Sequence, residues 1–206
     1  QPEASSSSAA GSCSACAAPD NFPATPGSPG SSTNSRIRGI STRAAKPSRE
    51  DDQAKLFEIA RSEPRWMYAY TAAVLAFYSG MRACEIKGLR WENVNWDSSL
   101  IDIKRSKTPA GWRSPSLNEV CRDALSELYS KASEVGFGEP DHFIFPWHGR
   151  EKDIDPTRPM TSWRTSWRAM LKRAGLTGVR FHDGRHTAIT TLAEKGLADW
   201  VIQAQV

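Results

Sequence analysis

An abrupt change of composition before residue 47 sets the strongest limit on how this 206-residue chain can fold. In residues 1–35, Ser, Ala, Pro and Gly fill 25 of 35 positions, and Phe22 is the one large apolar side chain. Such a segment buries too little apolar surface to offset the entropy lost on ordering. Residues 1–46, which end in a short basic linker, are therefore predicted to be disordered. One domain is predicted over residues 47–206.

Apolar residues recur with helical spacing through most of the predicted domain. A first helix is expected after Ser48, which can form a capping box with Asp51, and its buried stripe is expected to be Leu56, Phe57 and Ala60. A second is expected over residues 66–79, where apolar residues stand at i, i+3, i+4 and i+7. Further helical patterns follow over residues 82–88, over 183–195 and from residue 198 onward, and Asn118 and Thr161 are each expected to cap another helix. The helix after Asn118 is expected to bury Cys121, Ala124, Leu125 and Leu128, and the helix after Thr161 is expected to bury Trp163, Trp167, Met170, Leu171 and Ala174.

Between these helical patterns the period changes once to that of a strand. Residues 100–104 read as a strand, a turn signal follows, and residues 112–117 are expected to return as the second strand of a hairpin. Residues 136–159 are expected to form a loop. The predicted fold class is therefore α+β, mainly α with one small β-hairpin or sheet.

Basic residues are concentrated late in the chain. The net charge is only +4, with 27 Lys and Arg against 23 Asp and Glu. From Arg158 to Arg185, however, the sequence contains seven Lys or Arg and only one Asp. Arg164, Arg168 and Lys172 follow at i, i+4 and i+8, so they share one helix face and suit contacts to phosphates. A solvated basic face without a ligand is the alternative that this pattern leaves open.

Several classes of protein are excluded or disfavoured by what the sequence lacks. The mean hydropathy is −0.53, and no apolar stretch is long enough to span a membrane. The pair Cys13 and Cys16 has no second pair of ligands nearby, so a zinc site is not predicted. Cys84 and Cys121 are expected to be small core residues. No metal-protease, P-loop or serine-hydrolase motif is present.

Three cations and one histidine stand directly after structural breaks: Arg82, Lys107, His182 and Arg185. They come from three separated segments, as expected if a fold gathers them around one anion. A phosphodiester suits this set. Arginine forks match the two non-bridging oxygens of a reacting phosphate. A lysine can protonate the leaving oxygen, and a histidine can assist as acid, base or donor.

The residues around these positions resemble the motifs of one family. Ser79-Gly80-Met81-Arg82-Ala83-Cys84-Glu85-Ile86 resembles the first arginine box of the tyrosine recombinases, the phage integrase family. Ser106-Lys107-Thr108 resembles their hairpin lysine, and Phe181-His182-Asp183-Gly184-Arg185-His186-Thr187 resembles their H-x-x-R box. The resemblance extends over about residues 47–206.

The resemblance implies a role for each matched residue. Arg82 and Arg185 would clamp the scissile phosphate, Lys107 would be the general acid, and His182 would assist proton transfer. Glu85 would orient its neighbours and His186 would be structural. The basic residues near these motifs would contact DNA; they are Arg105, Arg113, Arg164, Arg168 and Lys172.

The resemblance also implies a reaction and its partners. The family exchanges DNA strands through a 3′-phosphotyrosyl link without a metal or a high-energy cofactor. Its members assemble as tetramers on duplex DNA, which implies a cytoplasmic, nucleoid-associated bacterial protein with no membrane partner. The chain stops before the place of the family's nucleophilic tyrosine, so these 206 residues are expected to be inactive alone and monomeric.

Two departures from the family pattern carry expectations. Gly184 stands where the family usually has a bulky apolar residue, so looser local packing is expected. The return strand contains Pro115 in an imperfect match to the usual ending. Three alternatives remain open from sequence: a DNA-binding remnant without catalysis, a type IB topoisomerase, and a helical interaction protein with a basic face.

Overall fold

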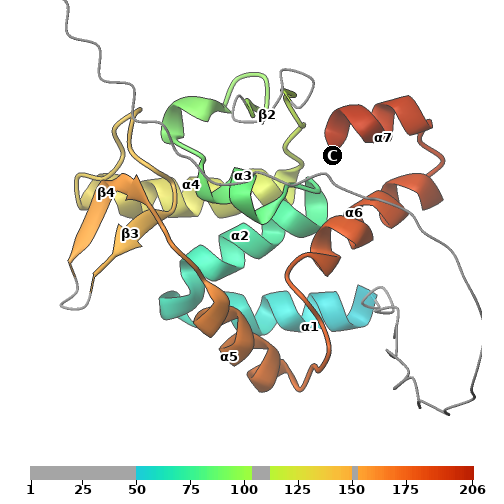
Figure 1. Cartoon of the computed structure of the whole chain (residues 1–206), viewed down its shortest axis with the longest axis horizontal. Coiled ribbons are helices and arrows are strands. Elements are labelled where there is room, and N and C mark those ends of the chain that lie inside the picture. The colour runs from blue at the N-terminus through green and yellow to red at the C-terminus, as the bar shows by residue number, and fades with distance from the viewer. Residues whose placement is uncertain (1–49, 104–111, 150–152) are drawn as a thin grey trace, which may run out of the picture. The chain divides into compact units, whose positions relative to one another are not determined.

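A computed structural model describes residues 50–103, 112–149 and 153–206, all within one unit, Arg43–Val206. The predicted disorder of residues 1–46, the Ser48 cap and the pair Cys13 and Cys16 lie outside the described residues. Within them the chain runs mainly through helices, with two small antiparallel sheets (Figure 1).

Helix α2 (Met67–Tyr78) lies at the centre of the core, because apolar side chains occupy almost its whole circumference. Eight of its twelve residues are buried, and it packs against α1 (Glu50–Arg61), α3 (Ala83–Lys87), α4 (Glu119–Glu134) and α6 (Asp183–Glu194). A 3-10 turn, Pro64–Trp66, leads into it. The predicted stripe Leu56, Phe57 and Ala60 is buried on α1, which also contacts α5 (Arg164–Ala174).

The predicted hairpin after residue 100 forms only in part. Strand β2 (Leu100–Ile101) pairs with β1 (Val94–Asn95), which follows a 3-10 turn, Trp91–Asn93. Residues 112–117 form two isolated bridges instead of a strand, Leu100 with Ser116 and Ile103 with Arg113. Pro115 lies between these bridges and has no N–H to donate, so the ladder is interrupted there.

The two predicted core cysteines differ in the structure. Cys121 is buried on α4, where its backbone N–H donates to Asn118 Oδ1 at 2.9 Å, so the predicted helix cap is confirmed. Burial raises the pKa of the Cys121 thiol to about 12. The expectation for Cys84 was wrong, because this side chain is exposed. Helix α3 has five residues and buries Glu85 and Ile86, which leaves Cys84 facing solvent.

The prediction of a loop over residues 136–159 was also wrong. Strands β3 (Pro146–His148) and β4 (Ile154–Pro159) pair antiparallel, with a register shift between Pro146 and Trp147. Both strands contain proline and β4 alternates poorly, so the sequence signal for a strand is weak. Ahead of β3, the apolar run Phe143, Ile144 and Phe145 is buried in the core.

Helix α5 buries one apolar face and exposes its cations. The predicted face is confirmed, since Trp163, Trp167, Met170, Leu171 and Ala174 are all buried. The predicted cap at Thr161 was wrong. The backbone N–H of Arg164 instead donates to Ser162 Oγ at 3.1 Å.

Helix α6 packs so closely on α2 that its second residue must be small. A Cβ at Gly184 would meet the Phe77 ring, with Cε2 only 2.6 Å away. The expectation of looser packing at Gly184 is therefore corrected, because Phe77 occupies the space that a larger residue 184 would need. The close approach instead makes glycine necessary here.

Helix α7 (Asp199–Gln205) packs against α6 and is hydrogen-bonded to the segment before α4. Gln205 Oε1 accepts from both the N–H and the hydroxyl of Ser116 at 3.0 Å, and Gln205 Nε2 donates to the Ser116 carbonyl at 3.0 Å. Over the described ranges, no helix is long and apolar enough to cross a membrane.

Candidate active site

The turn between α2 and α3 is joined to α6 at the predicted site. Gly80 takes a φ of +64°, which glycine adopts without strain. The Gly80 carbonyl accepts a hydrogen bond from Arg185 Nη1. A side chain at residue 80 would also clash with Val206, because an added Cβ would lie 3.1 Å from the Val206 Cβ. Arg185 is thereby fixed beside the turn that carries Arg82.

Glu85 lies between two arginines and is almost completely buried. Its Oε1 accepts from Arg82 Nη1 at 2.8 Å and from Arg113 Nη1 at 3.0 Å. Its Oε2 accepts from the Arg82 backbone N–H at 2.7 Å and from Arg113 Nη2 at 2.8 Å. The bond from the Arg82 backbone N–H is part of the capping box at the start of α3. The carboxylate therefore orients both the helix and the two guanidinium groups.

The pKa values follow from this arrangement. Burial alone would raise the pKa of Glu85, but the hydrogen bonds from Arg113 and Arg82 outweigh it and lower the pKa to about 2. Burial lowers the pKa of Arg185, and the nearby charges of Arg82 and Arg113 lower it further. Arginine still stays protonated at any ordinary pH. The three guanidinium groups are thus close enough to repel one another.

This cluster carries more positive than negative charge. Arg82, Arg113 and Arg185 face the single carboxylate Glu85. The Arg82 side chain is 49% exposed, whereas the Glu85 side chain is 6% exposed. Because an excess of partly buried cations is stabilised by an anion, the arrangement suits a phosphate group from solvent.

The structure places His182 and His186 one turn apart at the start of α6. Their rings meet edge to face, with centroids 5.0 Å apart, and both side chains are exposed. His182 is the N-cap residue of α6, three residues before Arg185. A ring at this end of the helix faces solvent, where a ligand can reach it.

Two predicted cations, Arg105 and Lys107, lie outside the described residues. The described residues on either side of them are paired, because the Ile103 N–H donates to the Arg113 carbonyl at 2.9 Å. Arg113 in turn binds Glu85, so the described residue that follows this segment belongs to the arginine cluster. Arg113, for which the resemblance implies a DNA contact, has a side chain that is 9% exposed and bound to Glu85.

A cationic groove of about 460 Å³ continues from this cluster. It is lined by Ala83 and Phe181, the neighbours of Arg82 and His182, and by apolar residues of α5. Its lining also holds four basic side chains, Lys87, Arg164, Arg168 and Arg180. Lys87 and Arg180 were not predicted as site residues, although each lies a few residues from a recognised motif. Lys172 is exposed on α5 one turn beyond Arg168.

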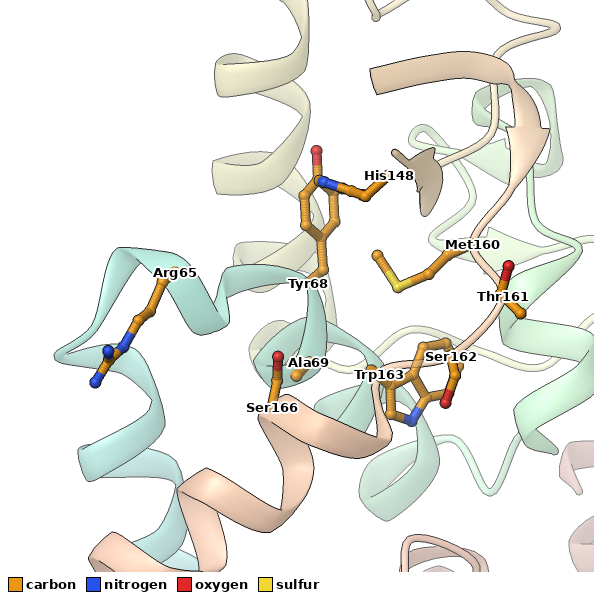
Figure 2. A pocket seen from close by; sticks show the side chains of 9 residues that line it. All are labelled: Arg65, Tyr68, Ala69, His148, Met160, Thr161, Ser162, Trp163 and Ser166. Atoms are coloured by element: carbon orange, nitrogen blue, oxygen red, sulfur yellow. The ribbon is translucent and has the colours of Figure 1, made fainter. Parts of the chain in front are cut away.

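A separate cavity of about 240 Å³ lies between the start of α2, strand β3 and the start of α5 (Figure 2). Tyr68 and His148 lie side by side at its edge, with ring centroids 5.1 Å apart. Burial raises the pKa of Tyr68 and lowers that of His148. None of the sequence-predicted site residues lines this cavity, so it is distinct from the arginine cluster.

The four tyrosines of the chain pack against other aromatic rings. Tyr70 and Tyr78 contact Phe57, with centroids 6.0 and 5.9 Å apart, and Tyr129 contacts Trp91 at 4.9 Å. Tyr68 contacts His148 as described above. Among the described residues, no group of three or more His, Cys, Asp or Glu could hold a metal ion.

Comparison with known families decides the assignment. The sequence model of the phage integrase family matches residues 48–206. This chain belongs to the phage integrase family. Prophage integrase IntR of Escherichia coli is 27% identical over 176 residues, covering 72% of this chain and 40% of the relative. An integrase of Saccharopolyspora erythraea is 32% identical over 110 residues, covering 50% and 23%. The chain spans less than half the length of these relatives.

Two solved structures, of an integrase and of a recombinase, have the same fold. The Tn1549 transposon integrase, solved in complex with circular intermediate DNA, has a TM-score of 0.61 at 18% identity, covering 80% of this chain and 57% of that one. The XerA recombinase has a TM-score of 0.61 at 21% identity, covering 77% and 55%. The prediction of a mainly helical tyrosine recombinase catalytic domain with small antiparallel sheets is confirmed.

Proposed function

We propose that this chain is the catalytic-domain part of a site-specific recombinase that acts on duplex DNA. The observation that carries the proposal is the arginine cluster, in which Arg82 and Arg185 come from separate motifs to one cationic site. A scissile phosphate supplies the anion that this site lacks. Membership of the integrase family supports recombination as the overall reaction.

The proposed reaction is a transesterification at phosphorus. A tyrosine oxygen attacks the phosphate, its proton leaves to a base, and a 3′-phosphotyrosyl bond forms as the bond to the 5′ oxygen breaks. Arg82 and Arg185 stabilise the charge on the non-bridging oxygens. Lys107 protonates the leaving 5′ oxygen, and His182 assists proton transfer. The guanidinium groups supply the charge that metal ions supply in other nucleases, so the step needs no metal.

The proposed assembly extends beyond these 206 residues. Since the four tyrosines pack against aromatic rings, we assign the nucleophile to a segment of the longer protein and expect these 206 residues not to cleave DNA alone. The lambda integrase structure is a tetramer bound to a Holliday junction. We propose the same assembly for the whole protein, on DNA in the bacterial cytoplasm.

The cationic groove is the proposed path of the DNA backbone. It begins beside Arg82 and His182 and continues along α5, so phosphates next to the scissile one would meet Arg164, Arg168 and Lys172. Lys87 donates to the Thr161 carbonyl at 3.2 Å, which keeps its ammonium at the edge of the same groove. Regular spacing of cations along a helix suits successive phosphates.

Salt dependence tests whether this surface binds DNA. If Arg82 and Arg185 share one phosphate and Arg164, Arg168 and Lys172 each neutralise another, a plot of log affinity against log salt has a slope of roughly −3 to −4. The measurement is fluorescence anisotropy of a labelled 30-base-pair duplex from 50 to 300 mM NaCl. Arg164→Gln and Arg168→Gln should each reduce the slope by about one. Binding that does not change with salt would exclude the proposed surface and favour a helical interaction protein.

A further inference from the structure

Arg113 has a geometry unlike that of the two arginines proposed to hold the phosphate. Its side chain is 9% exposed against 49% for Arg82. Both of its terminal nitrogens bind Glu85, at 3.0 and 2.8 Å, while its Nε is buried without a hydrogen-bond partner. Because this guanidinium is buried and both of its terminal nitrogens bind Glu85, its remaining N–H groups are shielded from DNA.

We propose that Arg113 is a positioning residue, which keeps Glu85 paired so that the Arg82 guanidinium is free to bind the phosphate. The inference rests on the function proposed above for Arg82. It replaces the DNA contact that the sequence suggested for Arg113. Arg113 acts through Glu85 and touches neither the phosphate nor the reacting atoms.

The role of Arg113 depends on which partner Glu85 keeps when DNA binds. When Arg82 turns toward a phosphate, Glu85 loses the bond to Arg82 Nη1. It keeps the bidentate pair with Arg113 and the bond from the Arg82 backbone N–H. A buried carboxylate without a counter-ion is strongly destabilising. Without Arg113, Glu85 would therefore hold the Arg82 side chain and compete with the phosphate for it.

The charged groups around Glu85 define the direction of the expected pH effect. The cations that face it are Arg82 at the start of α3, Arg113 before α4 and Arg185 on α6. Glu92, Asp102 and Arg90 line a hollow of about 300 Å³ together with Glu85. Removing Arg113 takes away a buried cation that binds both oxygens of Glu85 through its side chain, so Glu85 should become easier to protonate. Protonated Glu85 would release Arg82, so lost DNA affinity should return as the pH falls.

The test compares the DNA affinity of variants of the 206-residue chain between pH 5 and pH 8. Arg113→Met should weaken binding of the labelled duplex about tenfold at pH 8. The loss relative to the unmodified chain should shrink toward pH 5. Adding Glu85→Gln to Arg113→Met should restore most of the affinity at pH 8, since the amide no longer holds Arg82. Arg61→Met, which removes the same charge from the end of α1, should leave affinity and pH profile unchanged.

The outcomes separate this inference from the proposed function. If the unmodified chain binds DNA without salt dependence, the proposed function fails. If it binds as expected but Arg113→Met matches it at every pH, Arg113 has no positioning role. Should Arg113→Met not fold, Arg113→Lys decides, because it keeps the charge but not the two-point contact. Weaker binding at an unchanged melting temperature supports the inference, and equal binding overturns it.

Discussion

Replacing Gly184 by leucine is expected to destabilise the domain by about 3 kcal/mol, although leucine is the better helix former. The first added carbon would already overlap the Phe77 ring, with Cε2 2.6 Å away. That ring is 3% exposed and lies against Phe57, with centroids 5.5 Å apart. It has no room to move, so α6 must shift instead. The shift would displace Arg185 and His182 and weaken DNA binding as well.

Thermal and urea unfolding of three variants measure this effect. Thr190→Leu adds the same side chain to an exposed position of α6 and should change stability little. Adding Phe77→Leu to Gly184→Leu should recover part of the loss, because it gives the new side chain space. A Gly184→Leu variant as stable as the unmodified chain would show that α2 and α6 do not approach as closely as described.

Replacing Glu85 by glutamine is expected to lower the free energy of unfolding at pH 7 by about 3 kcal/mol. The variant leaves two guanidinium groups without their buried carboxylate. The pKa of Glu85 is lowered from 4.5 to about 2, so the charged form stabilises the folded chain above about pH 4.5. This stabilisation, on the order of 3 kcal/mol, is lost as the pH falls through about 2. The difference in the free energy of unfolding between the variant and the unmodified chain should therefore decrease toward zero as the pH falls from 5 to 2.

The matched control is Glu127→Gln. Glu127 also pairs with a cation, Lys131 at 2.8 Å, but both side chains are 44% exposed. An exposed pair of this kind contributes little, so its removal should change stability by less than about 1 kcal/mol at any pH. If Glu85→Gln changes the free energy of unfolding by an equally small amount, or by an amount that is the same at pH 2 as at pH 7, the buried ion pair is contradicted.

The sequence predicted the elements whose apolar period is strong and the residues that belong to recognised motifs. The buried faces of α1, α4 and α5 are the ones that the spacing of their apolar residues predicts, because each helix packs one continuous apolar stripe against the core. Arg82 and Arg185 were placed together from motifs alone. Strand β4 was missed because its prolines and weak alternation give no clear period.

Other features could not be predicted because they depend on which side chains meet. The resemblance implied a DNA contact for Arg113, and no local pattern indicates that it pairs with Glu85, which is 28 positions earlier. Gly184 looked like a loss of packing, because the compensating Phe77 is in a distant segment. Cys84 has apolar neighbours, but the shortness of α3 decides which side faces solvent. For Arg113 and Gly184 the partner is far away in sequence, at Glu85 and Phe77.

The most direct test of the central claim is a double-mutant cycle on Arg82 and Arg185. Affinity for the labelled duplex is measured for the unmodified chain, Arg82→Gln, Arg185→Gln and the double variant. If both arginines hold one phosphate, each single variant loses affinity and the double variant loses less than the sum, with a coupling of at least about 1 kcal/mol. Strictly additive losses, or no loss at either position, would contradict a shared phosphate-binding site.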